Sequence, residues 1–351
     1  MIQASTRTHT LHFRFPAGTS RGVLHEHTAH YIYLQDPEDP QTVGIGEAAP
    51  LKGLSPEYGE NFGEQVAQAC ALFSEQPFGM DDIATYIPHD LPSLRFAFEV
   101  ALRDYENGGK RHIYDNFFVR HEGRLPINGL IWMGKPDFMQ EQIEDKLAAG
   151  YDCLKLKIGA IDFETELAIL KGIRKRFSAD TLTLRVDANG AFSPAEALQK
   201  LERLAAFDLH SIEQPIAAGQ PEAMHRLCQN APLPIALDEE LIGVMNTTDR
   251  IALLDHIQPP FIILKPTLVG GLSAAAEWIR LAEARGIGWW ITSALESNIG
   301  LNAIAQFTAE YTPKIPQGLG TGQLYHNNIP SPLRVEAGTI RYDTNSEWEV
   351  I

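Results

Sequence analysis

The stretch Cys153-Leu-Lys-Leu-Lys-Ile158 places two lysines one residue apart in a run that is otherwise apolar. Alternate side chains of a β-strand point to the same face, so Lys155 and Lys157 should project together from a buried strand. Burying two like charges side by side is costly unless anions lie nearby. The stretch therefore predicts a strand whose polar face meets a cluster of acids.

Three carboxylates and a further lysine follow at near-regular intervals, each at the end of another strand-like run. They are Asp187 (run 182–187), Glu213 (209–213), Asp238 (234–238) and Lys265 (261–265). Counted from Lys157, the steps are 30, 26, 25 and 27 residues, which is the length of one strand, one helix and two loops. Helix-like stretches such as 193–204, which begins Ser-Pro, lie between these runs.

Further strand-like runs bring the number of strands to eight. They lie near residues 125–131, 286–293 and 317–320. Eight βα units in succession predict an α/β fold with a closed parallel barrel of the (β/α)8 type, whose functional groups gather at the carboxyl ends of the strands. We expect this barrel to occupy residues 123–325.

The residues ahead of the barrel follow a different pattern. The 351 residues exceed the roughly 250 that such a barrel needs. Strand-like runs at 10–15, 23–34 and 42–48 precede helix-like runs at 58–74 and 93–107, which predicts an α+β capping domain over residues 1–122. The tail, 326–351, holds one more strand candidate at 339–342 and is expected to return to the capping domain.

Composition excludes several classes of partner. A formal net charge of −16 argues against nucleic acid, because a polyphosphate needs a basic face. The three cysteines, Cys70, Cys153 and Cys228, give neither a disulfide framework nor a paired metal spacing. No early run is long and apolar enough for a signal peptide or a spanning helix. We expect a cytoplasmic protein without a membrane partner; the sequence does not indicate its number of subunits.

Asp187, Glu213 and Asp238 should end adjacent strands and therefore point into one space. Three anions cannot share it without neutralisation. An all-oxygen set of this kind suits a hard divalent cation, Mg²⁺ first and Mn²⁺ as the alternative. Any one of these acids alone would more simply cap a helix or pair with a lysine, but their common phase favours a metal site.

The lysines should flank this site, with Lys155 and Lys157 on one side and Lys265 on the other. A lysine near a divalent cation and a second amine has its protonated form disfavoured, which makes it a usable base. Simple ion pairing with the acids is the alternative. A metal with opposed lysines can remove a proton from a carbon next to a carboxylate, so we expect a small-molecule carboxylate as substrate.

Several motifs carry a family pattern. They are Leu154-Lys-Leu-Lys157, Arg185-Val-Asp-Ala-Asn-Gly190, Ser211-Ile-Glu-Gln-Pro215, Ala236-Leu-Asp-Glu-Glu240 and Leu264-Lys-Pro266. Together they resemble the barrel of the enolase superfamily, muconate-lactonizing subgroup. Gly44-Ile-Gly-Glu-Ala-Ala-Pro-Leu51 resembles the loop by which that family's capping domain closes over substrate.

Within the subgroup, three segments are most similar to the branch that forms o-succinylbenzoate in menaquinone biosynthesis. They are Ile127-Asn-Gly129, Thr292-Ser-Ala-Leu-Glu-Ser-Asn298 and Gly318-Leu-Gly-Thr-Gly322. The resemblance implies that Asp187, Glu213 and Asp238 bind the metal. It implies that Lys157 removes the proton beside the ring carboxylate of a succinyl-hydroxycyclohexadiene carboxylate and returns a proton to the departing hydroxyl on the same face.

The same resemblance implies supporting roles for other residues. Lys265 would stay protonated and hold the opposite face of the substrate by charge and cation–π attraction. Lys155 would orient Lys157 or the substrate carboxylate. Asn189 and Glu239 would support the metal ligands through hydrogen bonds.

Residues that select the substrate are less evident in the sequence. Ser293 and the Gly320-Thr321 turn, at the seventh and eighth strand ends, could hold the succinyl group through a hydroxyl and backbone N–H groups. Simple turn geometry is the alternative for the glycine. His25-Glu-His27 with His30 resembles a metal-ligand cluster. Because it lies well ahead of the barrel, we interpret it as paired surface or substrate-lid histidines.

Other functions remain open at this point. An N-acylamino acid racemase, a dipeptide epimerase or a cycloisomerase of the same subgroup would use the same metal and lysines. The epimerase is disfavoured because the eighth strand lacks the Asp-x-Asp that grips a substrate ammonium in that branch. A noncatalytic barrel that binds a carboxylate metabolite is the alternative of a different class.

Overall fold

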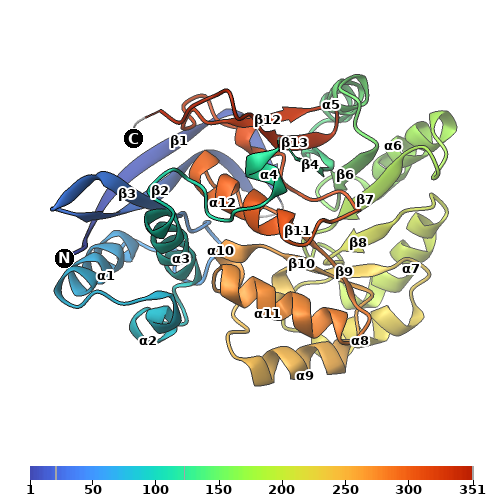
Figure 1. The fold of residues 1–351 in the computed structure, drawn as a ribbon. Coiled ribbons are helices and arrows are strands. Elements are labelled where there is room, and N and C mark those ends of the chain that lie inside the picture. Colours follow the sequence, from blue (N-terminus) through green and yellow to red (C-terminus); the bar gives the residue numbers. More distant parts are fainter. Residues whose placement is uncertain (20–21, 122, 350–351) are drawn as a thin grey trace.

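The computed structural model describes residues 1–19, 22–121 and 123–349 (Figure 1). Its central element is a seven-stranded sheet of parallel strands that lie side by side in sequence order. The strands are β5 (Gly129–Ile131), β6 (Cys153–Lys157), β7 (Thr183–Asp187), β8 (Ser211–Glu213), β9 (Ile235–Leu237), β10 (Phe261–Leu264) and β11 (Gly288–Ile291). The α/β barrel-type fold predicted from the regular spacings is confirmed.

The eighth predicted strand, 317–320, is reduced to isolated bridges. Gln317 pairs in parallel with Ile127, and Gly318 pairs in parallel with Thr292. This short segment therefore joins the end of β11 to the chain just before β5, so the curled sheet closes on itself. Pro316 and two glycines in this stretch have low strand propensity, which explains why no regular strand forms.

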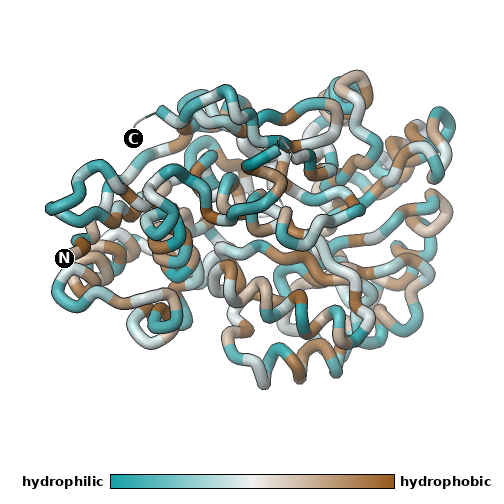
Figure 2. The backbone as a smooth tube through the Cα atoms, viewed as in Figure 1, coloured by the Kyte–Doolittle hydropathy of each residue, from teal (hydrophilic) through white to brown (hydrophobic). Residues whose placement is uncertain are grey.

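Helices between the strands cover the outside of the sheet. They are α5 (Pro136–Ala148), α6 (Phe163–Arg176), α7 (Pro194–Ala205), α8 (Pro221–Asn230), α9 (Thr247–Ile257), α10 (Pro266–Val269), α11 (Leu272–Glu283) and α12 (Asn298–Ala309). The predicted Ser-Pro start is confirmed at α7, where Ser193 and Glu196 form a capping box. Figure 2 shows hydrophobic runs on the central strands, while hydrophobic and hydrophilic residues alternate along the outer helices.

The side chains of the strands separate by alternation. Leu154, Leu184 and Ile212 are fully buried in the core that contains the helices. Their neighbours on the same strands therefore point to the opposite face, toward the inside of the barrel. This alternation sends Lys155 and Lys157 inward, as the sequence predicts.

The N-terminal part is an antiparallel sheet followed by helices, in the predicted order. Its strands are β1 (Gln3–Thr19), β2 (Gly22–Asp36) and β3 (Asp39–Ala48), and its helices are α1 (Phe62–Glu75), α2 (Ile83–Tyr86) and α3 (Pro92–Glu106), with a 3₁₀ turn η1 (Met80–Asp82). Helix α3 packs closely on β3, because a Cβ at Gly46 would lie 1.9 Å from the Ala97 carbonyl oxygen. Glycine at this position permits the contact.

One predicted strand is divided. Within 125–131, β4 (Arg124–Pro126) pairs antiparallel with β13 (Thr339–Tyr342), which pairs in turn with β12 (Leu333–Glu336). The barrel sheet begins at β5, and a short helix α4 (Phe117–Arg120) precedes β4. The tail thus forms a small sheet with β4, and its Trp348 packs against a hydrophobic cluster that includes residues of the N-terminal sheet and of the barrel. The domain limits at 122 and 325 stay predictions.

Candidate active site

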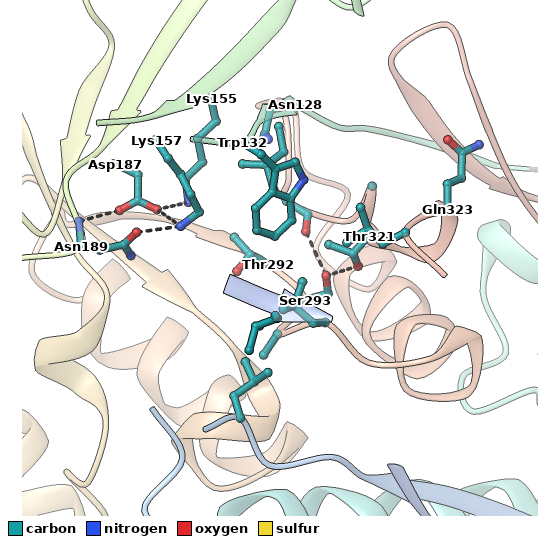
Figure 3. A pocket seen from close by; sticks show the side chains of 18 of the residues that line it. Asn128, Trp132, Lys155, Lys157, Asp187, Asn189, Thr292, Ser293, Thr321 and Gln323 are labelled. Atoms are coloured by element: carbon teal, nitrogen blue, oxygen red, sulfur yellow. Dashed lines mark hydrogen bonds and ion pairs between the residues drawn. The ribbon is translucent and has the colours of Figure 1, made fainter. Parts of the chain in front are cut away.

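The carboxyl ends of the barrel strands open into a cavity of about 430 Å³ (Figure 3). Lys155, Lys157 and Asp187 line one wall together with Asn189, and Lys265 contributes from the position just after β10. Residues after β11 and residues of the segment after β3 complete the enclosure; they are Thr292, Ser293, Ala294, Leu295, Leu51, Lys52 and Leu54. The cavity therefore lies between the barrel and the N-terminal part.

Lys155 is held between two acids. Its Nζ lies 3.0 Å from Asp187 Oδ2 and also contacts Glu213 Oε2. Burial alone would lower the pKa of Lys155, but the charges of Asp187 and Glu213 outweigh burial and raise it. Lys155 is therefore a buried cation that is paired with two acids.

Lys157 contacts one acid and one amide instead of two acids. Its Nζ donates to Asn189 Oδ1 at 2.7 Å and to Asp187 Oδ2 at 3.1 Å. Asn189 adopts a left-handed backbone conformation, with φ of 44°, which Asn tolerates better than most residues. Its backbone N–H donates to Asp187 Oδ1 at 3.0 Å, and its Nδ2 donates to Glu239 Oε1 at 3.0 Å. Asn189 thus orients both the lysine and the acid.

Lys265 lies on the other side of the acids. Its Nζ contacts Asp238 Oδ2 and lies 3.9 Å from Glu213 Oε1. Burial would lower the pKa of Lys265, but Asp238 and Glu213 outweigh it and raise the pKa. The lysines predicted to flank the acids are brought together with them.

Glu213 and Asp187 respond in opposite ways to this crowding. Burial and the neighbouring Asp187 raise the pKa of Glu213 to about 8. Burial also acts to raise the pKa of Asp187, but Lys155 and Lys157 outweigh burial and lower it. The less paired of the two acids is Glu213, whose Oε1 accepts no hydrogen bond from the described residues.

The predicted metal site differs in one respect from the expectation. Asp187 and Glu213 end β7 and β8, and Asp238 directly follows β9, so the three acids lie at the ends of adjacent strands, as predicted. Within residues 1–19, 22–121 and 123–349, however, no three His, Cys, Asp or Glu side chains approach one common ion position. The ammonium groups of Lys155 and Lys265 lie between the acids instead. Buried carboxylate oxygens such as Glu213 Oε1 nevertheless fit a hard divalent cation.

The predicted substrate-binding residues form a different wall. Ser293 Oγ and Thr321 Oγ1 lie 2.5 Å apart, and both line the cavity with Gly320. Figure 3 shows Ser293 and Thr321 pointing toward each other, away from the cluster of Lys155, Lys157 and Asp187. The structure therefore places a neutral hydroxyl pair on one side of the cavity and the charged groups on the other.

The sequence did not single out several other residues of this wall. Asn128, Trp132 and Gln323 line the cavity (Figure 3). Asn128 is buried, and its Oδ1 accepts no hydrogen bond from the described part of the chain. The motif Ile127-Asn-Gly129, which contributes to the family resemblance, could have identified Asn128 as a residue of the cavity. Trp132 follows β5 without any local pattern that distinguishes it from a core residue.

Comparisons with known proteins add a family to this geometry. A family model described as enolase C-terminal domain-like matches residues 138–346. An o-succinylbenzoate synthase from Desulfotalea psychrophila is 50% identical over 97% of this chain and 98% of its own length. An L-Ala-D/L-Glu epimerase from Bacillus subtilis is 26% identical over 81% of this chain and 78% of its own length.

Solved structures agree with these relatives. The crystal structure of MenC from Desulfotalea psychrophila has a TM-score of 0.84 at 46% identity, and the match covers 97% of this chain and 99% of that one. A dipeptide epimerase from Enterococcus faecalis, complexed with Mg and a dipeptide, has a TM-score of 0.84 at 19% identity, with 99% and 97% covered. The latter likeness concerns the fold alone.

Proposed function

Because the chain belongs to the enolase C-terminal domain-like family, we propose that it is an o-succinylbenzoate synthase. It would dehydrate 2-succinyl-6-hydroxy-2,4-cyclohexadiene-1-carboxylate to o-succinylbenzoate, a step of menaquinone biosynthesis. The 50% identity over nearly the full length of both chains carries this proposal. A cytoplasmic location without a membrane partner is part of the proposal, and the location rests on the three free cysteines. The exclusion of a nucleic-acid partner rests on the net charge of −16. No helix of the described residues is long and apolar enough to cross a membrane.

Lys157 is the base of this proposed reaction. It lines the cavity, and Asn189 orients its Nζ at 2.7 Å. Its amine form takes the proton from the carbon beside the ring carboxylate. The resulting ammonium then gives a proton to the leaving hydroxyl on the same face, so water departs and the ring becomes aromatic. Lys155 suits this role less well, because two acids hold it as a cation.

Lys265 and Lys155 supply charge. Lys265, against Asp238 on the far side of the acids, stays protonated and attracts the negative charge that develops as the proton leaves. Lys155 keeps Asp187 and Glu213 in place from the β6 side. Both amines therefore act by position and charge, without exchanging a proton with the substrate.

Members of this family typically depend on a divalent metal ion. Asp187, Glu213 and Asp238 would hold it here, supported by Asn189 and Glu239, and the all-oxygen set favours Mg²⁺, with Mn²⁺ as the alternative. The ammonium groups that lie between the acids would give way to it. The cation would supply positive charge beside the substrate carboxylate as that group becomes more negative.

Incubation with the cyclohexadiene acid and Mg²⁺ tests the proposal. The aromatic product should appear in the absorbance spectrum, and Lys157→Ala is the matched control that lacks the base. Absence of product at micromolar enzyme would contradict the synthase assignment. Racemisation of an N-succinylamino acid under the same conditions, without dehydration, would instead favour the racemase alternative.

A further inference from the structure

The ring of His27, on β2, connects two segments that enclose the cavity. Its Nε2 lies 3.1 Å from the carbonyl oxygen of Ala49, just after β3. Its Nδ1 lies 3.1 Å from the carbonyl oxygen of Leu295, after β11. The residue is 6% exposed, so the interpretation of His27 as a surface histidine is wrong, whereas a substrate-lid role stays a prediction. It lies inside the contact between the N-terminal sheet and the barrel.

The segment after β11 is strained where it meets this ring. Leu295 has φ of 68°, in the left-handed region that L side chains rarely adopt. Its carbonyl oxygen also accepts a hydrogen bond of 2.6 Å from the Tyr325 hydroxyl. Ser293 precedes it by two residues on the cavity wall. Contacts to Leu295 therefore influence where the Ser293 hydroxyl lies.

The hydrogen bonds around the ring assign its tautomer. Burial lowers the pKa of His27, which favours the neutral ring with a single N–H. The Tyr325 hydroxyl already donates to the Leu295 carbonyl oxygen. A proton on His27 Nε2 therefore provides a donor for the Ala49 carbonyl oxygen as well. Each neutral tautomer turns one ring lone pair toward a carbonyl oxygen, Leu295 when Nε2 carries the proton and Ala49 when Nδ1 carries it. With the proton on Nε2, Ala49 accepts from the ring and Leu295 accepts from the Tyr325 hydroxyl, which lies 3.4 Å from Nδ1. In the imidazolium, the Nδ1–H group donates to Leu295 as well, so the ring then bonds both segments directly.

We propose that His27, together with Tyr325, is a positioning residue that ties the segment after β3 to the strained segment after β11. By this link the ring sets the distance between Leu51, on the capping side, and Ser293, on the barrel side. The effect on substrate binding rests on the proposed function, whereas the link itself is a property of the fold. Neither ring nitrogen takes part in the chemistry.

Hydrogen exchange tests the link without any substrate. Reporter amides are Leu51, bonded to Ser55 Oγ, and Ala294 and Ser297, bonded to Glu296 and Glu47. His27→Phe should speed exchange at all three by roughly 3- to 10-fold, the range expected for one lost hydrogen bond. His27→Gln keeps a donor for Ala49 and should restore slow exchange at Leu51. Tyr325→Phe should affect Ala294 and Ser297 more than Leu51.

Steady-state kinetics tests the consequence for the reaction. In His27→Phe the KM for the cyclohexadiene acid should rise roughly 3- to 10-fold while kcat changes little, and His27→Gln should recover most of the loss. Wild-type exchange at all three amides, or a wild-type KM, in His27→Phe would overturn the proposal. If His27→Phe does not fold, unchanged exchange at Ala294 and Ser297 in Tyr325→Phe overturns it equally. An inactive wild-type enzyme would refute the synthase assignment and leave the exchange test standing.

Discussion

Buried carboxylates occur in two regions of this molecule and are compensated differently. At the strand ends, Asp187, Glu213 and Asp238 face ammonium groups of lysines. Between the N-terminal part and the barrel, Glu47 and Glu99 instead accept hydrogen bonds from backbone N–H groups at the starts of α12 and α11.

This difference separates function from stability. A lysine side chain is long and can move, so its charge can be replaced by a metal ion or redirected to a substrate. A helix N-terminus is rigid and presents fixed donors, so it holds a carboxylate but cannot exchange it. We therefore expect substitutions at the strand ends to affect turnover and substitutions at the helix starts to affect the free energy of unfolding.

The largest effect is expected at Lys157. Lys157→Ala deletes the proposed base, and general base catalysis typically contributes about 10²- to 10⁴-fold, so kcat should fall by that order. Asp187 keeps Lys155 at 3.0 Å, so folding should be little affected. Initial rates and a thermal melt measure both effects. A wild-type kcat in this variant would show that Lys157 is not the base. A large loss of melting temperature would contradict the expectation that substitutions at the strand ends affect turnover and not stability.

Glu47→Gln should show the reverse pattern. Glu47 accepts from the Ser297 N–H at 2.7 Å, the Ser297 hydroxyl at 2.6 Å and the Gly300 N–H at 2.8 Å. An amide turns its NH₂ group toward two of these donors or loses one acceptor, which should cost about 2 kcal/mol of unfolding free energy. Chemical denaturation measures this loss. The activity per folded molecule should stay within a few-fold of the wild type.

Glu99→Gln is the matched variant for the second helix start. Glu99 accepts from the N–H groups of Leu272 and Ser273 at the start of α11 and does not line the cavity. The Glu99→Gln variant should therefore also have a lower free energy of unfolding than the wild type. A fall in kcat comparable to that of Lys157→Ala in either glutamate variant would show that the helix starts are not separate from the chemistry.

The pH dependence of stability should reveal Glu296, which lies beside Glu47. Burial, with a smaller contribution from Glu47, raises the pKa of Glu296 from its ordinary value of 4.5 to about 7. The folded state thus holds this proton more tightly than the unfolded state, and the stability that it contributes is complete below pH 4.5 and lost as pH rises through about 7. Glu296→Gln should flatten the slope of unfolding free energy in that window. An unchanged slope would contradict the assignment.

The strand-end region was predictable and the helix-start region was not, for a physical reason. Lys155, Lys157 and Asp187 lie in apolar runs of period two, and a local pattern of this kind indicates both the strand and its polar end. Glu47 contacts Ser297 and Gly300, about 250 residues away, and no pattern in the sequence near Glu47 predicts these partners.

Long-range pairing also explains the division of the first predicted barrel strand. Residues 125–131 form one apolar run in the sequence, but strand β13 of the tail pairs with β4 at the start of this run. Pairing across more than 200 residues depends on where the tail returns, which the run itself does not encode. His27 belongs to the same class, since its partners Ala49 and Leu295 come together only in the folded chain.

The smallest effect is expected for an ion pair in a third environment, the exposed surface. Arg203 meets Glu164 between α7 and α6 at 2.6 Å, with side chains 44% and 66% exposed. The same charges that matter at the strand ends are here screened by water and salt, and exposed pairs contribute little. Arg203→Gln should therefore leave both the melting temperature and kcat at wild-type values, at low and at high salt. If this variant instead lost as much unfolding free energy as Glu47→Gln, burial would not be what distinguishes these regions. The distinction between carboxylates paired with movable lysines and carboxylates held by helix N-termini would then be wrong.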